Sequence, residues 1–330
     1  MSASKPFKIA LVGNPNLGKT TLFNRLCGLN QRTGNYPGVT IDKKKGHLKS
    51  GDKNVEVIDL PGINSLFPSS KDEELVVDYL LDTQNEEYPD KIVLVVSALN
   101  LKRNLYLFEQ IRDLNRPMVL AINMADLAEK RGVFVYEKAL AKELGVPVVF
   151  ISAKKGTGID ELVKRCMESV KISERTPTYL QEDELVFLEK YKALKGYPNN
   201  YISFLKLTTS SKNEEDHQSK VFIAENEIKV RKWKTNASIL RYKHINSYLD
   251  KVLTIDKSKA SDLTSKLDRV LLHPIFGYVI FIGILLLVFQ AIFWLAGFPM
   301  EWIESAFEWL QGAASAVCLK VTSLDWFVKD

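Results

Sequence analysis

The fold of this 330-residue chain is decided by the stretch Gly13-Asn14-Pro15-Asn16-Leu17-Gly18-Lys19-Thr20, which matches the phosphate-binding pattern GxxxxGK[ST]. The pattern alone arises by chance, so its surroundings decide its meaning. Here it follows the apolar run Phe7–Val12, which predicts a strand, and it precedes a segment over Thr21–Leu26 that predicts a helix. A phosphate-binding loop requires this strand–loop–helix order, and we therefore expect one at residues 13–20.

The residue types in this loop suit the phosphates of a nucleotide. Gly13 and Gly18 let the backbone pass close to a phosphate, so that N–H groups and the positive end of the next helix face the anion. We expect Lys19 to contact the β- and γ-phosphates and the Thr20 hydroxyl to bind Mg²⁺. The expected nucleotide contacts in this part of the chain are Gly13, Asn14, Pro15, Asn16, Leu17, Gly18, Lys19, Thr20 and Thr21.

Short apolar runs alternate with amphipathic segments through the first 171 residues. The runs lie at Val55–Ile58, Ile92–Val96, Met118–Ile122 and Val146–Ile151. Helices are expected over Leu101–Asp113, Val135–Leu144 and Gly158–Val170. Near-continuous Val, Ile and Leu runs separated by helices predict an α/β fold whose mostly parallel sheet is covered on both faces.

Three further motifs follow in the order that a GTPase requires, each after a predicted strand. Asp59-Leu60-Pro61-Gly62 provides Asp59 as a magnesium ligand through water, and the Gly62 N–H for the γ-phosphate. Asn123-Met124-Ala125-Asp126 provides Asp126, whose carboxylate can accept two hydrogen bonds from guanine N1 and N2. Ser152-Ala153-Lys154 provides backbone N–H groups for guanine O6. Ligands bind at the carboxyl ends of strands in open α/β sheets, so this arrangement predicts a GTP site.

Two positions depart from the usual GTPase pattern. Met124 stands where a lysine is usual, which removes a polar contact and predicts modest nucleotide affinity. Ile63 follows Gly62, where Ras-like GTPases have the glutamine that orients the attacking water. Isoleucine cannot orient water, and we therefore expect slow intrinsic hydrolysis unless another group supplies that role.

The composition divides the chain into unequal parts. It is 46% hydrophobic and 26% charged, which excludes a collagen-like or disordered chain. However, only seven charged residues lie after position 269, and four of the five tryptophans lie there. The net charge of +5 is too mild to indicate nucleic acid, and we expect no nucleic-acid partner. The three cysteines are far apart and form no CxxC pair, which fits a reducing compartment.

A helix-rich region is expected over residues 172–266, after the nucleotide-binding region of residues 1–171. Helix-like spacing marks Asp183–Leu194 and Ile239–Leu253, and Ser210–Ser219 has the composition of a polar loop. For Val221–Trp233 the pattern leaves strand and helix open.

Residues 267–330 begin a membrane region. The core Ile275–Phe298 is apolar on all sides, and a helix of that length spans roughly 36 Å, which is enough to cross a bilayer. Residues 229–269 contain eleven Lys or Arg against four Asp or Glu, whereas the first charges after the span are acidic. This asymmetry places the part before the span in the cytoplasm.

The motifs together carry a specific resemblance. With GNPNLGKTTLFN at 13–24, DLPG at 59–62 and NMAD at 123–126, the sequence Gly34-Asn35-Tyr36-Pro37-Gly38-Val39-Thr40 resembles FeoB, the prokaryotic ferrous-iron transporter family. The resemblance implies a cytoplasmic P-loop GTPase domain of the Ras-like, TrmE–Era type, then a helical domain that tunes nucleotide affinity and a permease for Fe²⁺ in the bacterial inner membrane. It covers almost the whole chain, and the GNYPGVT signature is its most discriminating part.

The resemblance also implies roles for individual residues. Thr40 corresponds to the first-switch threonine that closes on Mg²⁺ and the γ-phosphate, with Gly38 and Val39 beside the nucleotide. Asn16 corresponds to the asparagine that binds K⁺ in cation-activated members, and this cation can supply positive charge in the transition state. The first switch is expected over about residues 31–42 and the second over about 62–71. GTP, GDP, Mg²⁺ and K⁺ are the expected ligands, and Fe²⁺ the transported substrate.

The chain has one clear span, and one span cannot line a transport path. We therefore expect a fragment whose remaining permease helices lie elsewhere, with the lipid bilayer, a second copy of the chain and a small accessory protein as candidate partners. Two rival interpretations stay open: a membrane-tethered regulatory GTPase that only binds partners, and an Era-like ribosome or RNA GTPase. The basic runs at Lys43–Lys45 and Lys229–Lys234 are the only support for the last, and the apolar span argues against it.

Overall fold

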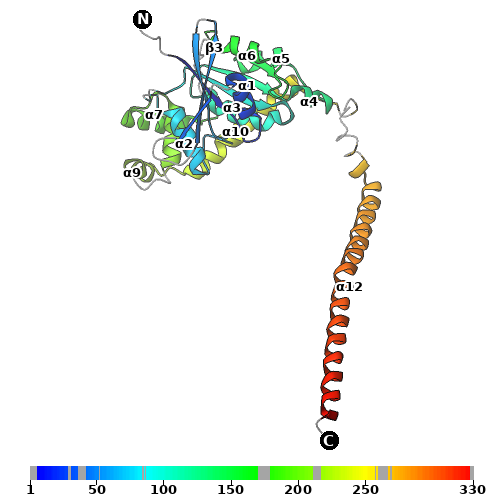
Figure 1. Cartoon of the computed structure of the whole chain (residues 1–330). Coiled ribbons are helices and arrows are strands. Elements are labelled where there is room, and N and C mark those ends of the chain that lie inside the picture. Colours follow the sequence, from blue (N-terminus) through cyan, green and yellow to red (C-terminus); the bar gives the residue numbers. More distant parts are fainter. Residues whose placement is uncertain are drawn as a thin grey trace. The chain divides into compact units, whose positions relative to one another are not determined.

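The structure, a computed structural model, describes residues 6–28, 31–35, 42–51, 53–83, 85, 87–169, 179–210, 217–256, 258, 267 and 270–327. Its contacts form two compact units, residues 1–260 and residues 261–330. Figure 1 labels several elements of these units, which are described separately below.

A seven-stranded sheet in the order β2-β3-β4-β1-β5-β6-β8 forms the centre of the first unit. Its strands are β1 Phe7–Val12, β2 Gln31–Asn35, β3 Asp42–Ser50, β4 Lys53–Asp59, β5 Lys91–Ser97, β6 Met118–Asn123 and β8 Val148–Ile151. The run from β4 to β8 is parallel, whereas β3 pairs antiparallel with β4 and with β2. The predicted mostly parallel α/β fold is therefore confirmed.

The central strands are buried on both faces, which explains their continuous apolar sequences. In β1, Ile9 and Leu11 belong to one core cluster, whereas Ala10 and Val12 belong to the other. Helices α1 (Lys19–Cys27) and α6 (Ile159–Met167) contribute to the first cluster. Helices α2 (Lys71–Leu81), α3 (Leu101–Arg112) and α5 (Glu137–Leu144) contribute to the second.

The helical region extends this second core. It contains α7 (Glu182–Lys195), α8 (Asn200–Ser210), α9 (His217–Glu225) and α10 (Val230–Val252). Helix α10 packs along α3, where the rings of Tyr106 and Tyr242 stack with centroids 4.9 Å apart and the hydroxyls of Tyr106 and Ser238 lie 2.8 Å apart. Beyond them, Arg241 of α10 forms a buried ion pair with Asp113 at the end of α3.

A short second sheet joins the end of this region to the nucleotide-binding region. Strand β9 (Leu253–Ile255) follows α10 directly and pairs antiparallel with β7 (Val133–Val135). Backbone bonds extend the pairing at both ends, from Tyr136 N to Val252 O at 2.9 Å and from Asp256 N to Gly132 O at 2.7 Å. Strand β7 itself follows α4 (Ala125–Lys130), the helix that begins in the NMAD motif.

Several predicted element boundaries are wrong. The predicted loop Ser210–Ser219 is helical at both described ends, because α8 reaches Ser210 and α9 begins at His217. The open segment Val221–Trp233 is helical over most of its length. Val135 belongs to β7 rather than α5, and the closing helix ends at Met167. The pattern also missed three helices and four strands, namely α2, α4, α8, β2, β3, β7 and β9.

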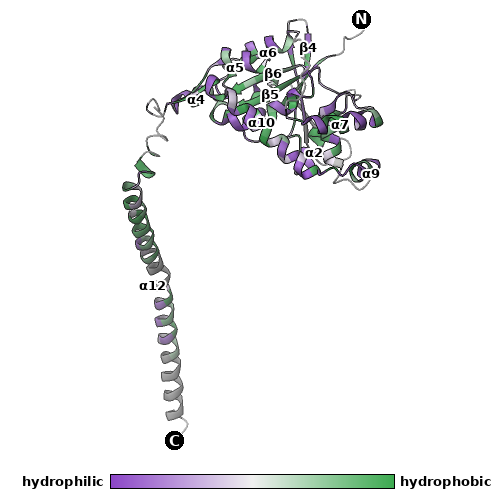
Figure 2. Ribbon diagram, turned by 180° about the vertical axis from the view of Figure 1, so that it is seen from behind, coloured by the Kyte–Doolittle hydropathy of each residue, from purple (hydrophilic) through white to green (hydrophobic). Residues whose placement is uncertain are grey.

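The second unit contains α12, a single helix over Phe276–Phe327. Within it, the 19 residues Phe276–Trp294 have a mean hydropathy of 2.5 and are fully unburied in the structure. Figure 2 shows this first part of α12 as predominantly hydrophobic. By length and composition it is the one described helix able to cross a membrane.

Candidate functional site

Residues 13–18 form the loop between β1 and α1, and its backbone explains the residue types there. Gly18 has φ 83°, in the left-handed region, and Gly13 has φ 155°. A Cβ atom on Gly13 would lie 2.3 Å from Val95 O, and one on Gly18 would lie 2.6 Å from Asn123 Nδ2. The glycines thus allow the loop to lie directly against β5 and the NMAD motif. Asn16 also has a left-handed φ, 63°, and is exposed at the tip of the loop.

Lys19 lies at the first turn of α1 and is buried. Its Nζ donates a hydrogen bond to Asn14 O at 3.3 Å. Burial lowers the pKa of this ammonium, and the nearby Asp59 carboxylate partly opposes that shift. A phosphate bound in the loop would supply the opposite charge that favours the ammonium form.

Thr20 and Asp59 form a pair suited to a divalent cation. Thr20 Oγ1 donates to Asp59 Oδ2 at 2.9 Å, although the residues are 39 positions apart. The other carboxylate oxygen, Asp59 Oδ1, is buried without a hydrogen-bond partner among the described residues. Burial raises the pKa of Asp59, against the hydrogen bond from Thr20 and the charges of Lys19 and Lys44. A hard cation prefers such oxygen ligands, so the residues present fit Mg²⁺.

Gly62 lies directly against the phosphate loop. A Cβ atom here would be 2.9 Å from both Pro15 N and Pro15 Cα, and 3.1 Å from Lys19 Nζ. The next residue, Ile63, points away from the site into the core, where it is fully buried, and its N–H donates to Gly13 O at 3.1 Å. The side chain of Ile63 therefore does not reach a nucleotide.

The base-binding motifs meet around Asn123, which is buried at the end of β6. Its Nδ2 donates to Leu17 O at 2.8 Å and its Oδ1 accepts from Ala153 N at 3.1 Å. One side chain thus fastens the phosphate loop to the loop of Ser152, Ala153 and Lys154. Met124 follows with a left-handed φ of 62° and starts α4.

Asp126, in the first turn of α4, forms an ion pair with Lys155 Nζ at 2.5 Å. The hydrogen bond from Lys155 lowers the pKa of the Asp126 carboxyl, which stays ionised and able to accept hydrogen bonds. The side chain of Asp126 is 35% exposed, so a base can reach it.

The structure therefore brings together the predicted residues of the phosphate loop, of the DLPG and NMAD motifs and of the Ser152 loop. Gly38, Val39 and Thr40 lie outside the described residues, as does half of the predicted first switch, residues 36–41.

Sequence reasoning missed several residues that support the site. Arg25 of α1 holds the Ser152 loop, with Nε 3.3 Å from Ala153 O and an Nη 2.8 Å from Lys154 O. Asn104 of α3 donates to Asn14 Oδ1 at 2.8 Å. Their partners lie about 90 or more positions away in the chain, and no local pattern could have identified them.

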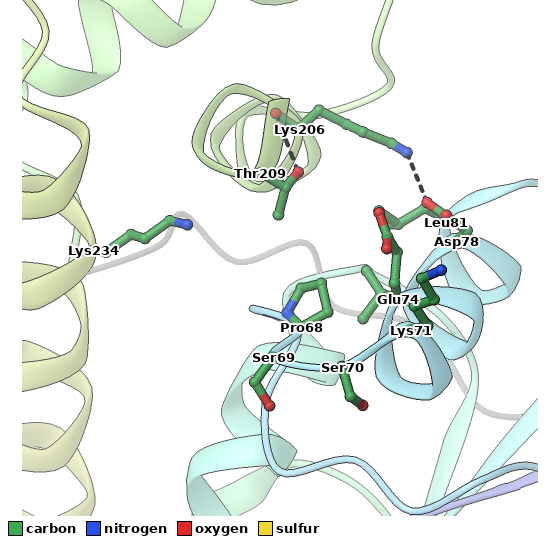
Figure 3. A pocket seen from close by; sticks show the side chains of 11 residues that line it. Pro68, Ser69, Ser70, Lys71, Glu74, Asp78, Leu81, Lys206, Thr209 and Lys234 are labelled. Carbon is green, nitrogen blue, oxygen red and sulfur yellow. Dashed lines mark hydrogen bonds and ion pairs between the residues drawn. The ribbon is translucent and has the colours of Figure 1, made fainter. Parts of the chain in front are cut away.

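A cavity of about 480 Å³ opens beside the second switch rather than at the phosphate loop. Figure 3 shows it between the start of α2 and the helices α8 and α10. Lys206 of α8 reaches Asp78 of α2 at 3.2 Å across this junction. Lys234 of α10 lies over the ring of Phe67, with its Nζ 5.1 Å from the centroid. Phe67, which belongs to the predicted second switch, is thus in direct contact with the helical region.

Comparison with known proteins connects this geometry to one family. Residues 7–166 match the family model described as Ferrous iron transport protein B. A Leptospira interrogans Fe(2+) transporter FeoB is 34% identical over 321 residues, covering 92% of this chain and 45% of that protein. The chain thus spans less than half the length of that curated relative.

Two solved structures extend the likeness through the helical region. The cytosolic domain of Legionella pneumophila FeoB has a TM-score of 0.65 and 34% identity, covering 75% of this chain and 99% of that one. The cytosolic domain of the Thermotoga maritima FeoB iron transporter, in a GMPPNP form, has a TM-score of 0.63 and 28% identity, covering 75% and 99%.

Proposed function

We propose that this chain, which belongs to the FeoB family, binds GTP and hydrolyses it to GDP and phosphate. The observation that carries this proposal is the Thr20–Asp59 pair, 2.9 Å apart beside the buried Lys19. These are the groups that a Mg²⁺–triphosphate needs, and the fold brings them together from the first turn of α1 and the end of β4. The GMPPNP-bound relative supports the same conclusion.

Each group has a role in phosphoryl transfer. Backbone N–H groups of residues 13–20 bind the phosphates. Lys19 Nζ donates to Asn14 O in this structure and would donate to the β- and γ-phosphates when the nucleotide is bound. Thr20, Asp59 and, by family resemblance, Thr40 would hold Mg²⁺, which neutralises charge on the phosphates when bound. The Gly62 N–H, which lies beside Pro15 and Lys19, would donate to the γ-phosphate. Asp126, released from Lys155, accepts hydrogen bonds from guanine N1 and N2.

Asn16 is the proposed K⁺ ligand. Its exposed position at the tip of the phosphate loop supports this role, because the side chain there is accessible to a cation from solvent. A monovalent cation there would place positive charge beside the transferring phosphoryl group, as an arginine finger does in other GTPases. The burial of Ile63 supports slow hydrolysis without this cation.

The longer protein is proposed to be an Fe²⁺ transporter whose nucleotide state drives or gates iron uptake. The named relatives support the substrate, and the apolar helix Phe276–Trp294 supports attachment to the bacterial inner membrane. By this proposal residues 1–171 form the cytoplasmic GTPase domain, residues 172–266 a regulatory helical domain, and residues 267–330 the start of the permease. The other permease helices, a second copy and a small accessory protein remain the proposed partners.

A membrane-tethered switch that only binds partners is the second candidate. The observation that favours it is Ile63, because its burial leaves no side chain at the usual water-orienting position. Fe²⁺ flux assays on the longer protein distinguish the transporter from the switch, because a switch binds GTP without supporting iron uptake.

Exchange of the base specificity tests the nucleotide proposal. Asp126→Asn in the full 330-residue chain should shift the preference from guanine toward xanthine nucleotides, because an amide can donate to the O2 of xanthine. Lys19→Ala should abolish binding of both while circular dichroism remains unchanged. Calorimetry with GDP and XDP measures the exchange, and unchanged GDP affinity in Asp126→Asn would remove Asp126 from the base site.

A further inference from the structure

A row of three asparagines crosses from α3 to the second switch through the phosphate loop. Asn104 Nδ2 donates to Asn14 Oδ1 at 2.8 Å, and Asn14 Nδ2 donates to Asn64 Oδ1 at 3.3 Å. Asn64 Nδ2 then donates to Glu73 Oε1 at 3.3 Å. We call this row the asparagine relay: Asn104, Asn14 and Asn64, ending on Glu73.

The direction of the relay is fixed at both ends. At its start, Asn104 Oδ1 accepts from the backbone N–H of Ser97 at 2.9 Å, and that group can only donate. Asn104 must therefore present its NH₂ group to Asn14. At its other end the Glu73 carboxylate can only accept when ionised. Each amide between them is thus forced into one orientation.

Glu73 is itself held in the accepting state. Its Oε2 accepts from Ser69 N at 2.8 Å and Ser69 Oγ at 2.7 Å, and its Oε1 also accepts from Asn64 N at 3.1 Å. Burial alone would raise the pKa of this carboxyl, but these hydrogen bonds outweigh burial and lower it. The end of the relay is therefore anchored at neutral pH.

The relay differs in exposure along its length. Asn104 and Asn14 are 2% and 5% exposed, so their bonds are shielded from water and an unpaired amide there is costly. Asn64 is exposed, and its Oδ1 also lies 3.4 Å from an Nη of Arg103. A change at Asn64 can therefore cut the relay without opening the core.

The position of the relay connects it to the γ-phosphate. Asn14 belongs to the phosphate loop, and its carbonyl oxygen holds Lys19 Nζ. Asn64 lies two residues after Gly62, which sits against Pro15 with no room for a side chain. The bond between Asn14 and Asn64 therefore fastens the second switch to the phosphate loop next to the Gly62 N–H.

We propose that Asn64 and Asn104 are positioning residues for the nucleotide site: with Asn14 they fix the loop after Gly62 so that its N–H meets the γ-phosphate. This inference rests on the proposed GTPase function. Because GDP lacks the γ-phosphate, the relay contributes to binding of a triphosphate and leaves GDP binding unaffected. The relay thus acts on the discrimination between the two nucleotides.

Asn64→Ala in the full 330-residue chain, in detergent micelles with Mg²⁺, tests this. The Kd for GMPPNP should rise roughly three- to tenfold, as expected for the loss of one or two hydrogen bonds, while the Kd for GDP changes less than about twofold. Asn104→Asp keeps the hydrogen bond from Ser97 N but places an oxygen opposite Asn14 Oδ1, where it cannot donate. This variant should therefore also raise the ratio of the Kd for GMPPNP to the Kd for GDP. Asn246→Asp, on the exposed face of α10, is the matched control and should leave the ratio unchanged.

The outcomes are distinguishable. Equal losses for both nucleotides in Asn64→Ala, or no loss for either, would overturn the positioning role. If Asn104→Asp does not fold, the exposed Asn64 still decides the question. Failure of the unmodified chain to bind GMPPNP or GDP would instead contradict the proposed function.

Discussion

Replacing Arg241 with methionine tests how strongly the helical region is held to the nucleotide-binding region. Arg241 is 2% exposed, and its Nη1 lies 2.6 Å from Asp113 Oδ2, at the end of α3. Its guanidinium carbon lies 3.5 Å from the ring centroid of Tyr179 and 4.9 Å from that of Tyr201. The Tyr179 hydroxyl donates to the same Asp113 oxygen at 2.6 Å.

The expected magnitude follows from the charge that remains. Removing one partner of a buried pair costs about 3–5 kcal/mol, because the other charge stays buried without compensation. Methionine fills most of the volume of the arginine stem, and Tyr179 still donates to Asp113, so we expect a value near the lower limit, about 3 kcal/mol. Removing both charges in Arg241→Met/Asp113→Asn should cost only about 1 kcal/mol, because a buried pair contributes little net stability over uncharged groups.

Urea unfolding of residues 1–260, a single compact unit, provides the assay. Trp233 is the sole tryptophan in this unit and lies on α10, the helix that carries Arg241, so its fluorescence reports the relevant region. The free energies of the two single variants and the double variant form a cycle. A loss below about 1 kcal/mol in Arg241→Met, or a double variant as unstable as the sum of the singles, would refute this account of the interface.

Three further predictions concern the nucleotide site. GTP hydrolysis by the full chain should be at least about tenfold faster in K⁺ than in Na⁺, and Asn16→Ala should remove the difference; equal rates in the unmodified chain would exclude the cation role. Gly62→Ala places a methyl group 2.9 Å from Pro15 backbone atoms. The rate of GTP hydrolysis, measured by phosphate release, should therefore fall by at least about tenfold, while the affinity for GDP measured by calorimetry is retained. Because the pKa of Glu73 is lowered in the folded chain, its stabilising effect is present above pH about 4.5 and is lost as the pH falls through the folded pKa. Acid unfolding followed by circular dichroism should therefore show a smaller acid-induced loss in Glu73→Gln than in the unmodified chain.

The local sequence was sufficient to predict an element where the apolar pattern of the segment itself determines its structure. The run Phe7–Val12 is β1 to the residue, and the amphipathic spacing over Leu101–Asp113 differs from α3 by one residue. Both segments are buried enough for their apolar pattern to be decisive. In contrast, β3 has the polar sequence Asp42–Ser50, and it is a strand because β4 provides an antiparallel partner for residues 44–50 and β2 one for residues 42–46.

The supporting residues of the site could not be predicted for a related reason. Lys19 and Asp59 could be located because each belongs to a short motif in which the chemistry of nucleotide binding fixes the residue types and their spacing. The asparagine relay joins side chains 90 and 50 positions apart, so only the fold brings them together. Asn104 lies in the middle of an amphipathic helix, where an asparagine has no local signature.

The pairing of β9 with β7 changes how the topology of the first unit is understood. The helical region leaves the nucleotide-binding region after α6, and the chain returns to that region at β9, so both ends of the helical region, and not only its first end, are joined to it. A force applied to the chain beyond Asp256 would reach the first unit through the β7–β9 ladder, whose strand β7 begins seven residues after Asp126. The NMAD motif, which we propose recognises guanine, is consequently the part of the proposed nucleotide site that lies nearest to this ladder along the backbone.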